Sequence, residues 1–263
     1  MDKLFVIKIG GNVIDHPGAL DAFLKDFAAI EAPRILVHGG GKIATRLGDQ
    51  LGIESKYVQG RRITDDAAID LVTMVYGGLV NKKIVAALQA KGCNAIGLTG
   101  ADGNCIPADK RPVGAIDYGW VGDVHPSRVH TPVLRALLDA GLVPVLAPLT
   151  HDGAGHILNT NADTIASAVA VALAASHAVR LIYCFEKRGV LEDLDREDSV
   201  ISLIDRVGYA RLLADGKLAD GIIPKIDNAF AAIDAGVKEV LIGDARDLRV
   251  NVTDRVSGTL IVP

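Results

Sequence analysis

Residues 4–12 read L-F-V-I-K-I-G-G-N, a short apolar run that one lysine interrupts and two glycines close. The run is long enough for a buried strand. An ammonium group is costly to bury unless it has an anionic partner or a shifted pKa. Gly10 and Gly11 let the backbone come close to a group that lies beyond the strand. We therefore expect Lys8 to face a phosphate chain, with the rest of the protein completing a site around it.

The order of strand, glycine turn and helix occurs twice in the first fifty residues. Residues 34–37 form a short β-type run, His38-Gly39-Gly40-Gly41 follows at once, and residues 42–52 have helical spacing. This order favours parallel strands joined by right-handed crossovers. The fold class that we expect is α/β, a three-layer αβα sandwich around a mainly parallel open sheet.

The middle of the chain contains two further features. Residues 100–130 are rich in Gly, Pro and Asp and predict a β-hairpin excursion from the sheet. Residues 57–63 are expected to be extended, with Thr64 then capping a long helix that ends near Ala90. The centre of this helix is apolar almost all round, which suits a core helix and a subunit interface equally.

Composition excludes several classes of protein. The 263 residues are 49% hydrophobic with a net charge of −4, and no dense basic run suggests nucleic acid or an anionic membrane as a partner. We find no segment that approaches a membrane span, and the chain begins almost directly with a strand, so we expect no signal peptide. The three cysteines and seven histidines form no metal-ligand pattern. We expect a cytoplasmic protein without a structural metal.

Familiar nucleotide and hydrolase motifs are absent from the sequence. It contains no G-x-x-x-x-G-K-[ST], no G-x-G-x-x-G after a strand and no G-x-S-x-G. Polar groups instead follow the predicted parallel strands, at the edge where open α/β sheets bind ligands. Consecutive glycines before a helix expose N–H groups that can bind phosphate or carboxylate oxygens. One such run is more often only a turn, but two at matching places, one with a lysine, favour an anion site.

Three further blocks carry candidate residues. Arg62, just before the long helix, can bind a carboxylate through two hydrogen bonds, whereas Arg61 points the opposite way and fits a solvated surface residue. Asn159-Thr160-Asn161-Ala162-Asp163 has the chemistry of a helix cap, which leaves one asparagine unexplained. Lys225 falls in the first turn of a predicted helix, where the dipole disfavours a cation unless an anion binds there.

The blocks K-I-G-G, H-G-G-G, G-R-R-I-T, N-T-N-A-D and D-G-I-I-P-K, in this order, resemble the amino acid kinase superfamily over essentially the whole chain. Within it, the chain is similar to the N-acetylglutamate kinases. The resemblance implies a carbamate kinase-like fold in a single domain, residues 1–263. An N-terminal lobe of about residues 1–175 would bind the acylated glutamate and dimerise, and a C-terminal lobe of about 176–263 would bind ATP.

The same resemblance implies an activity and site residues. The activity is ATP-dependent phosphorylation of the γ-carboxylate of N-acetyl-L-glutamate to the acyl phosphate, the second step of arginine biosynthesis. Mg²⁺ would be held mainly by phosphates and water. The roles that the resemblance implies are catalysis for Lys8, Asp163 and Lys225, substrate binding for Gly40, Gly41, Arg62 and Asn159, and nucleotide binding for Gly10, Gly11, Lys8 and Lys225.

Two departures from the family pattern leave alternatives open. Residues 184–189 (C-F-E-K-R-G) differ from the family's short S/T-D-V-x-G turn, so no adenine contacts can be transferred to them. The chain also lacks the N-terminal helical extension of arginine-inhibited hexamers, and we expect a homodimer that arginine does not inhibit.

The acyl group of the substrate stays open as well. An N-succinyl substrate would need another basic residue, for which Arg61, Lys110 and Arg111 are the candidates. More distant alternatives are an aminoadipate-type kinase and a non-catalytic sensor of amino acids or nucleotides.

Overall fold

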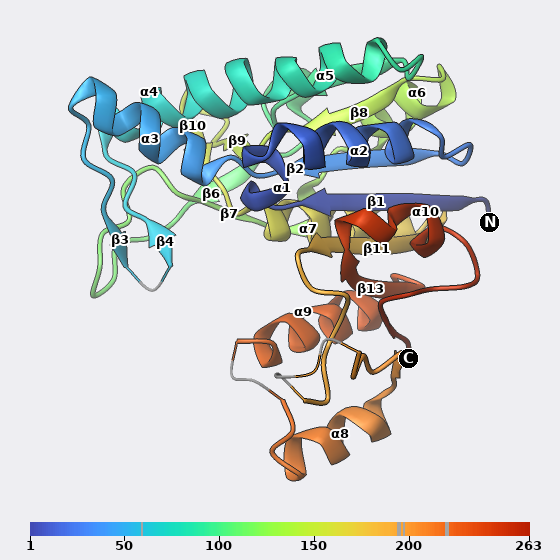
Figure 1. Ribbon diagram of the computed structural model, residues 1–263. Helices are drawn as coiled ribbons and strands as arrows, with labels where there is room; N and C mark the ends of the chain where they lie inside the picture. Colours follow the sequence, from blue (N-terminus) through green and yellow to red (C-terminus); the bar gives the residue numbers. More distant parts are fainter. Residues whose placement is uncertain (59, 194–195, 197, 219–220) are drawn as a thin grey trace.

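The computed structural model describes every residue except 59, 194–195, 197 and 219–220, and its centre is an eight-stranded sheet (Figure 1). The strand order is β12-β14-β13-β11-β1-β2-β8-β5. The strands are β1 (Lys3–Ile9), β2 (Arg34–His38), β5 (Ala95–Leu98), β8 (Val143–Leu146), β11 (Ala178–Phe185), β12 (Leu203–Ile204), β13 (Glu239–Asp244) and β14 (Thr259–Ile261). All neighbours are parallel except β13 and β14, so the expected mainly parallel sheet is confirmed.

The opening strand β1 lies inside this sheet, between β11 and β2. Its side chains alternate between the two cores: Leu4 and Val6 belong to one, and Phe5, Ile7 and Ile9 to the other. A strand that is covered on both faces reads as a continuous apolar run, which explains the opening sequence.

Helices cover both faces of the sheet, which confirms the three-layer sandwich. The core of Leu4 and Val6 also contains residues of α6 (Thr131–Asp139), α7 (Ala162–Ala174) and α9 (Ile223–Asp234). The opposite core contains residues of α1 (Gly11–Asp15), α2 (Pro17–Ala28), α3 (Gly41–Leu51), α4 (Asp66–Val72), the π-helix η1 (Thr73–Val80), α5 (Asn81–Gln89) and α10 (Leu248–Asn251). Figure 1 shows α8 (Arg206–Ala214) and α9 in a lower part of the molecule.

Three small antiparallel hairpins leave the main sheet. The pair β6 (Ala108–Lys110) and β7 (Gly122–Val124) confirms the hairpin expected near residues 100–130, and β9 (Leu149–His151) pairs with β10 (Ile157–Asn159). The third hairpin joins β3 (Tyr57–Val58) to β4 (Arg61–Arg62). The expectation of an extended segment over residues 57–63 is therefore wrong, because the chain reverses there through Gly60 at φ 73°. Short 3₁₀ turns complete the fold: η2 (Asp102–Asn104), η3 (Pro126–Arg128) and η4 (Ala245–Asp247).

The N-cap of the long helix lies one residue later than predicted. Asp65 is the N-cap and its carboxylate accepts a hydrogen bond from the N–H of Ala68 at 2.9 Å. Thr64 instead bridges to Gly119 of the hairpin region and accepts a hydrogen bond from Asn159 at 3.0 Å. Thr64 and Asp65 have similar capping chemistry, and the tertiary contacts of Thr64 decide between them.

Residues 66–89 form one helical stretch from α4 through η1 to α5. Contrary to the sequence expectation, this stretch is long and apolar enough to cross a membrane by length and composition. Its buried members, which include Leu71, Val75 and Ile84, belong to the core on one face of the sheet. The helix is long and apolar because it covers one face of the sheet, and a core helix of this kind has the same length and composition as a membrane span.

The division into two lobes at about residue 175 stays a prediction. β1 and β11, which come from the two proposed lobes, pair along the whole length of β1. The sheet itself is continuous across the boundary, and the region of α8 and α9 extends away from it in Figure 1, as the β3–β4 hairpin also does.

Candidate functional site

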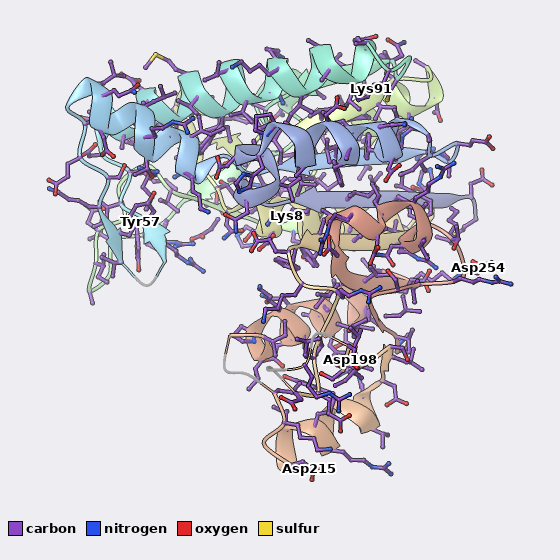
Figure 2. All side chains as sticks on the ribbon, viewed as in Figure 1. Lys8, Tyr57, Lys91, Asp198, Asp215 and Asp254 are labelled. Carbon is purple, nitrogen blue, oxygen red and sulfur yellow. The ribbon has the colours of Figure 1, made fainter. Side chains whose placement is uncertain are left out.

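A cavity of about 460 Å³ lies at the ends of the central strands. Its lining includes eight of the nine residues for which the sequence suggested a role: Lys8, Gly10, Gly11, Gly40, Gly41, Arg62, Asn159 and Asp163. Lys225 does not line this cavity. Figure 2 places Lys8 toward the end of the molecule that carries the β3–β4 hairpin, where Tyr57 is labelled.

Lys8 projects from the end of β1 on the face that α7 covers. The residue is only 8% exposed, and its Nζ lies 2.8 Å from a carboxylate oxygen of Asp163. Asp163 comes from the first turn of α7, where the side chain of Asn161 caps the helix by accepting from the N–H groups of Asp163 and Thr164. Strand alternation and the helix cap thus bring the two charges together at the cavity wall.

Two glycine turns form the floor of the cavity. Gly10 and Gly11 follow β1, Gly40 and Gly41 follow β2, and the N–H of Gly39 donates to the carbonyl of Ile9 at 3.1 Å. This bond ties the two turns together, so that their N–H groups share one region of space.

At Gly40 a side chain would be crowded. A Cβ there would lie 3.0 Å from Cδ1 of Tyr76, whose ring is buried and also lines the cavity. Tyr76 belongs to η1, and π-helical segments are frequent at functional sites. Burial raises the pKa of the Tyr76 hydroxyl, while the nearby Arg62 opposes that shift.

Arg62 is a buried cation whose partners are neutral. Its guanidinium donates to Ser55 Oγ, to the carbonyl of Gly41 at 3.2 Å and to Oγ1 of Thr45 at 2.9 Å. The group lies 4.9 Å from the centroid of the Tyr57 ring. Arg62 is 6% exposed and has no acidic partner within the described part of the chain. A buried guanidinium without a carboxylate is costly, so an anionic ligand beside it would relieve that cost.

The hairpins close the side of the cavity opposite the glycines. Asn159 of β10 donates to Thr64 at 3.0 Å and lines the cavity. Arg111 and Asp123 face each other across the β6–β7 hairpin in a bidentate ion pair. Because Asp123 neutralises Arg111, that arginine adds little free positive charge to the cavity.

His38 is hydrogen-bonded to the second glycine turn, and Asn81 is hydrogen-bonded to His38. Neither residue was assigned a role from the sequence. His38 Nδ1 lies 2.7 Å from the carbonyl of Gly39, which can only accept, so Nδ1 carries the proton. Nε2 then accepts from the amide of Asn81 at 3.1 Å, and the same amide donates to the carbonyl of Val145 at 2.9 Å. Burial lowers the pKa of His38 to about 4, so the ring is neutral near pH 7. In the sequence, the one sign of this contact is Asn81, the single asparagine within the apolar segment of residues 66–89.

Lys225 occupies the first turn of α9, as predicted from Pro224. Burial lowers the pKa of its ammonium group, with Lys8 acting in the same direction and with Asp163 and Glu186 opposing the shift. Lys225 is therefore close enough to Lys8 and Asp163 to interact with their charges. Asp220, the first residue of the D-G-I-I-P-K block, lies outside the described residues.

Comparison with known proteins agrees with this geometry. The amino acid kinase family model matches residues 3–244. Acetylglutamate kinase of Cytophaga hutchinsonii is 57% identical over 94% of each chain, and acetylglutamate kinase of Parabacteroides distasonis is 55% identical over 97% of this chain and 100% of that one.

Solved structures give the same answer for the fold. The structure of smu.665 from Streptococcus mutans is 31% identical, with a TM-score of 0.76 over 98% of both chains. An N-acetylglutamate synthase from Neisseria gonorrhoeae, complexed with coenzyme A and N-acetyl-glutamate, is 25% identical with a TM-score of 0.80 over 100% of this chain and 59% of that one.

The neutral state of His38 predicts a pH dependence of stability. Its pKa is about 4 in the folded protein against 6.5 ordinarily, so the unfolded chain takes up a proton first as the pH falls. Stability contributed by this histidine is complete above pH 6.5 and is lost as the pH falls toward 4. We expect His38 to account for about 2 kcal/mol of lost unfolding free energy between pH 7 and pH 5.

Urea unfolding of the natural protein and of His38→Gln at these two pH values measures this loss. The loss should be smaller in His38→Gln by that amount and unchanged in His16→Gln, which alters an exposed histidine. An equal loss in all three proteins would show that His38 is not held neutral by the fold.

Proposed function

The chain belongs to the amino acid kinase family, and we propose that Lys8, Lys225 and two glycine turns hold the phosphoryl group during its transfer. The protein is a kinase that phosphorylates N-acetylglutamate with ATP in arginine biosynthesis, and three of its relatives named acetylglutamate kinase are 55–58% identical to it. Each part of that reaction can be assigned to residues around the cavity.

The observation that carries the assignment is the ion pair of Lys8 and Asp163 beside the paired glycine turns. Phosphoryl transfer needs alignment of the reactants and neutralisation of charge more than covalent help. Lys8 supplies positive charge at the cavity wall, and the N–H groups of Gly11, Gly40 and Gly41 supply fixed dipoles. Asp163 holds the ammonium group of Lys8 and leaves its remaining hydrogens free for phosphate oxygens.

Arg62 and Asn159 would bind the amino-acid part of the substrate. Arg62 has guanidinium charge without an acidic partner in the described residues, which suits the α-carboxylate of the acylated glutamate. Asn159 offers its amide oxygen for the N–H of the acylamide, because its nitrogen donates to Thr64. These contacts would direct the γ-carboxylate toward Lys8.

The chemical step then requires no base. A γ-carboxylate oxygen attacks the γ-phosphorus of ATP, the bond from that phosphorus to the β–γ bridging oxygen breaks, and ADP leaves with the electron pair. The nucleophile is already ionised at neutral pH, since an ordinary glutamate pKa is about 4.3. Lys8 and Lys225 would stabilise the charge that develops on the transferring and leaving oxygens.

Mg²⁺ would arrive with ATP, and this donor set suits that arrangement. In the described residues no three His, Cys, Asp or Glu side chains gather as they would at a site of the protein's own. Mg²⁺ is commonly held by substrate phosphates and water, with few protein carboxylates. When bound, it would neutralise phosphate charge.

The role of Lys8 predicts a selective loss of turnover in Lys8→Arg. The guanidinium is larger and planar, so it keeps the charge but cannot reproduce the position of the ammonium group. We expect kcat to fall roughly 100-fold while the KM for ATP changes little. Steady-state assays of ADP release measure both constants.

Lys3→Arg, at the partly exposed start of the same strand, is the matched control and should retain full activity. Near-normal turnover of Lys8→Arg would remove Lys8 from the proposed mechanism.

An N-succinyl substrate is the second candidate, and one observation favours it. Among the three basic residues considered for a second carboxylate, Arg111 pairs with Asp123, and Lys110 lies 3.7 Å from the Trp120 ring centroid. Arg61 lines the cavity, is exposed, and has no ion pair or side-chain hydrogen bond in the part of the chain that the structure describes. Arg61 is exposed, as expected of a surface residue, and its position beside the cavity supports it as the candidate for binding an additional carboxylate.

ADP release with N-acetyl-L-glutamate, N-succinyl-L-glutamate and free glutamate separates the candidates. If the succinyl group is used, Arg61→Gln should raise the KM for N-succinylglutamate roughly tenfold and leave that for N-acetylglutamate unchanged. Equal effects on both substrates would exclude Arg61 as the second carboxylate site. Absence of activity on all three would favour a sensor or an aminoadipate-type kinase.

We also propose that the enzyme is a cytoplasmic homodimer that arginine does not inhibit. The apolar middle of the long helix leaves Met74 58% and Leu79 39% exposed in one chain, although both are large hydrophobic residues. A second copy packed there would bury them. Light scattering should give twice the 27.6 kDa of one chain, and a monomer or a hexamer would contradict the proposal.

A further inference from the structure

Phe185 lies close to both lysines of the proposed mechanism. It is the last residue of β11, the strand that pairs with β1, and its side chain is partly exposed. The Nζ of Lys225 lies 3.9 Å from the centroid of its ring, and the Nζ of Lys8 lies 5.5 Å from the same centroid. Both distances are within the range of cation–π attraction.

The ring also contacts a second aromatic side chain. Tyr183, two residues earlier on β11, stacks against it with ring centroids 6.3 Å apart and planes at 29°. The hydroxyl of Tyr183 donates to the backbone carbonyl of Asp163 at 3.4 Å, in the first turn of α7. Phe185 is therefore supported by the same helix start that holds Lys8.

Lys225 has more need of such support than Lys8. Lys8 has its ion pair with Asp163, whereas no acidic group of the described residues lies within ion-pair distance of Lys225. Lys225 also stands in the first turn of α9, where the helix dipole opposes a cation. The aromatic face attracts this ammonium group at close range, in addition to the carboxylates of Asp163 and Glu186, which lie beyond ion-pair distance.

We propose that Phe185 is a positioning residue for phosphoryl transfer, whose ring holds the ammonium groups of Lys225 and Lys8 at the spacing that the phosphates require. A carboxylate at this position would attract the lysines but would also cancel their charge. The ring attracts them through its quadrupole and leaves their full charge available to ATP. The inference rests on the proposed function of the two lysines.

Two other roles for Phe185 would produce different behaviour. A ring that only fills space depends on apolar volume and not on the electron density of its face. A ring that stacks on the adenine would change the binding of ATP instead of the rate of transfer. The family resemblance assigned no role to residues 184–189, so these alternatives are decided by measurement.

The test replaces Phe185 with mono-, di- and trifluorinated phenylalanine, introduced at that codon alone. Fluorine withdraws electron density from the ring face while nearly preserving its shape, so we expect kcat to fall stepwise, to roughly a tenth for the trifluorinated ring. Phe185→Tyr should retain most of kcat, and Phe185→Leu should lose roughly tenfold. kcat and the KM for ATP are measured at saturating N-acetyl-L-glutamate.

Phe230 provides the matched control. Its ring, on α9, lies 4.8 Å from the guanidinium carbon of Arg206 and does not line the cavity. The same fluorinated series at Phe230 should leave kcat unchanged. If Phe185→Leu fails to fold, the fluorinated variants at Phe185 still test the proposal, because they keep the packing of the natural side chain.

The outcomes separate this inference from the proposed function. A kcat that stays level across the fluorinated series, or a change confined to the KM for ATP, would overturn the role of Phe185 while the natural enzyme remains active. Lack of activity in the natural protein with every acylglutamate would instead contradict the proposed function.

Discussion

The ion pair between Lys8 and Asp163 is the interaction on which the site depends. It joins the end of β1 to the start of α7 at 2.8 Å, and the lysine is almost entirely removed from solvent. The Asp163 side chain is 40% exposed, so solvent screens the pair and loss of one partner costs less than it would in a fully buried pair. The pair therefore serves both the fold and the chemistry, because it fixes an ammonium group that a phosphate can reach.

The fold brings the remaining groups to this pair. Parallel strands end at one edge of the sheet, so the turns after β1 and β2 become neighbours, and the bond from Gly39 to Ile9 joins them. The Tyr76 ring occupies the space that a Cβ at Gly40 would need, and His38 hydrogen-bonds the carbonyl of Gly39. A π-helix and a buried neutral histidine thus determine the shape of one glycine turn.

Much of this arrangement could be predicted from local sequence. Lys8 and its glycines, the Asn161 cap and the strand–helix order depend on residues close together in the chain, where spacing is informative. The resemblance to a family then suggested which separate blocks meet. Four of the five blocks line one cavity in the described structure and the block of Lys225 does not, whereas the roles assigned to all five are proposals.

The errors and omissions have a common cause in long-range contacts. Thr64 was expected to cap a helix, but Gly119 and Asn159 engage it from far along the chain. The pairing of His38 with Asn81 spans 43 residues, and no periodic pattern signals such a contact. Phe185 stands in residues 184–189, to which no contacts could be transferred from the family, and the structure places two ammonium groups near its ring.

The most direct test of the central claim is single-turnover phosphoryl transfer in Asp163→Asn, with ATP and N-acetyl-L-glutamate both saturating. The substitution keeps the size of the side chain and removes the charge that holds Lys8. We predict that the rate of transfer falls at least roughly 100-fold while the dissociation constant of ATP stays within about threefold of its natural value. A transfer rate close to that of the natural enzyme would contradict the account.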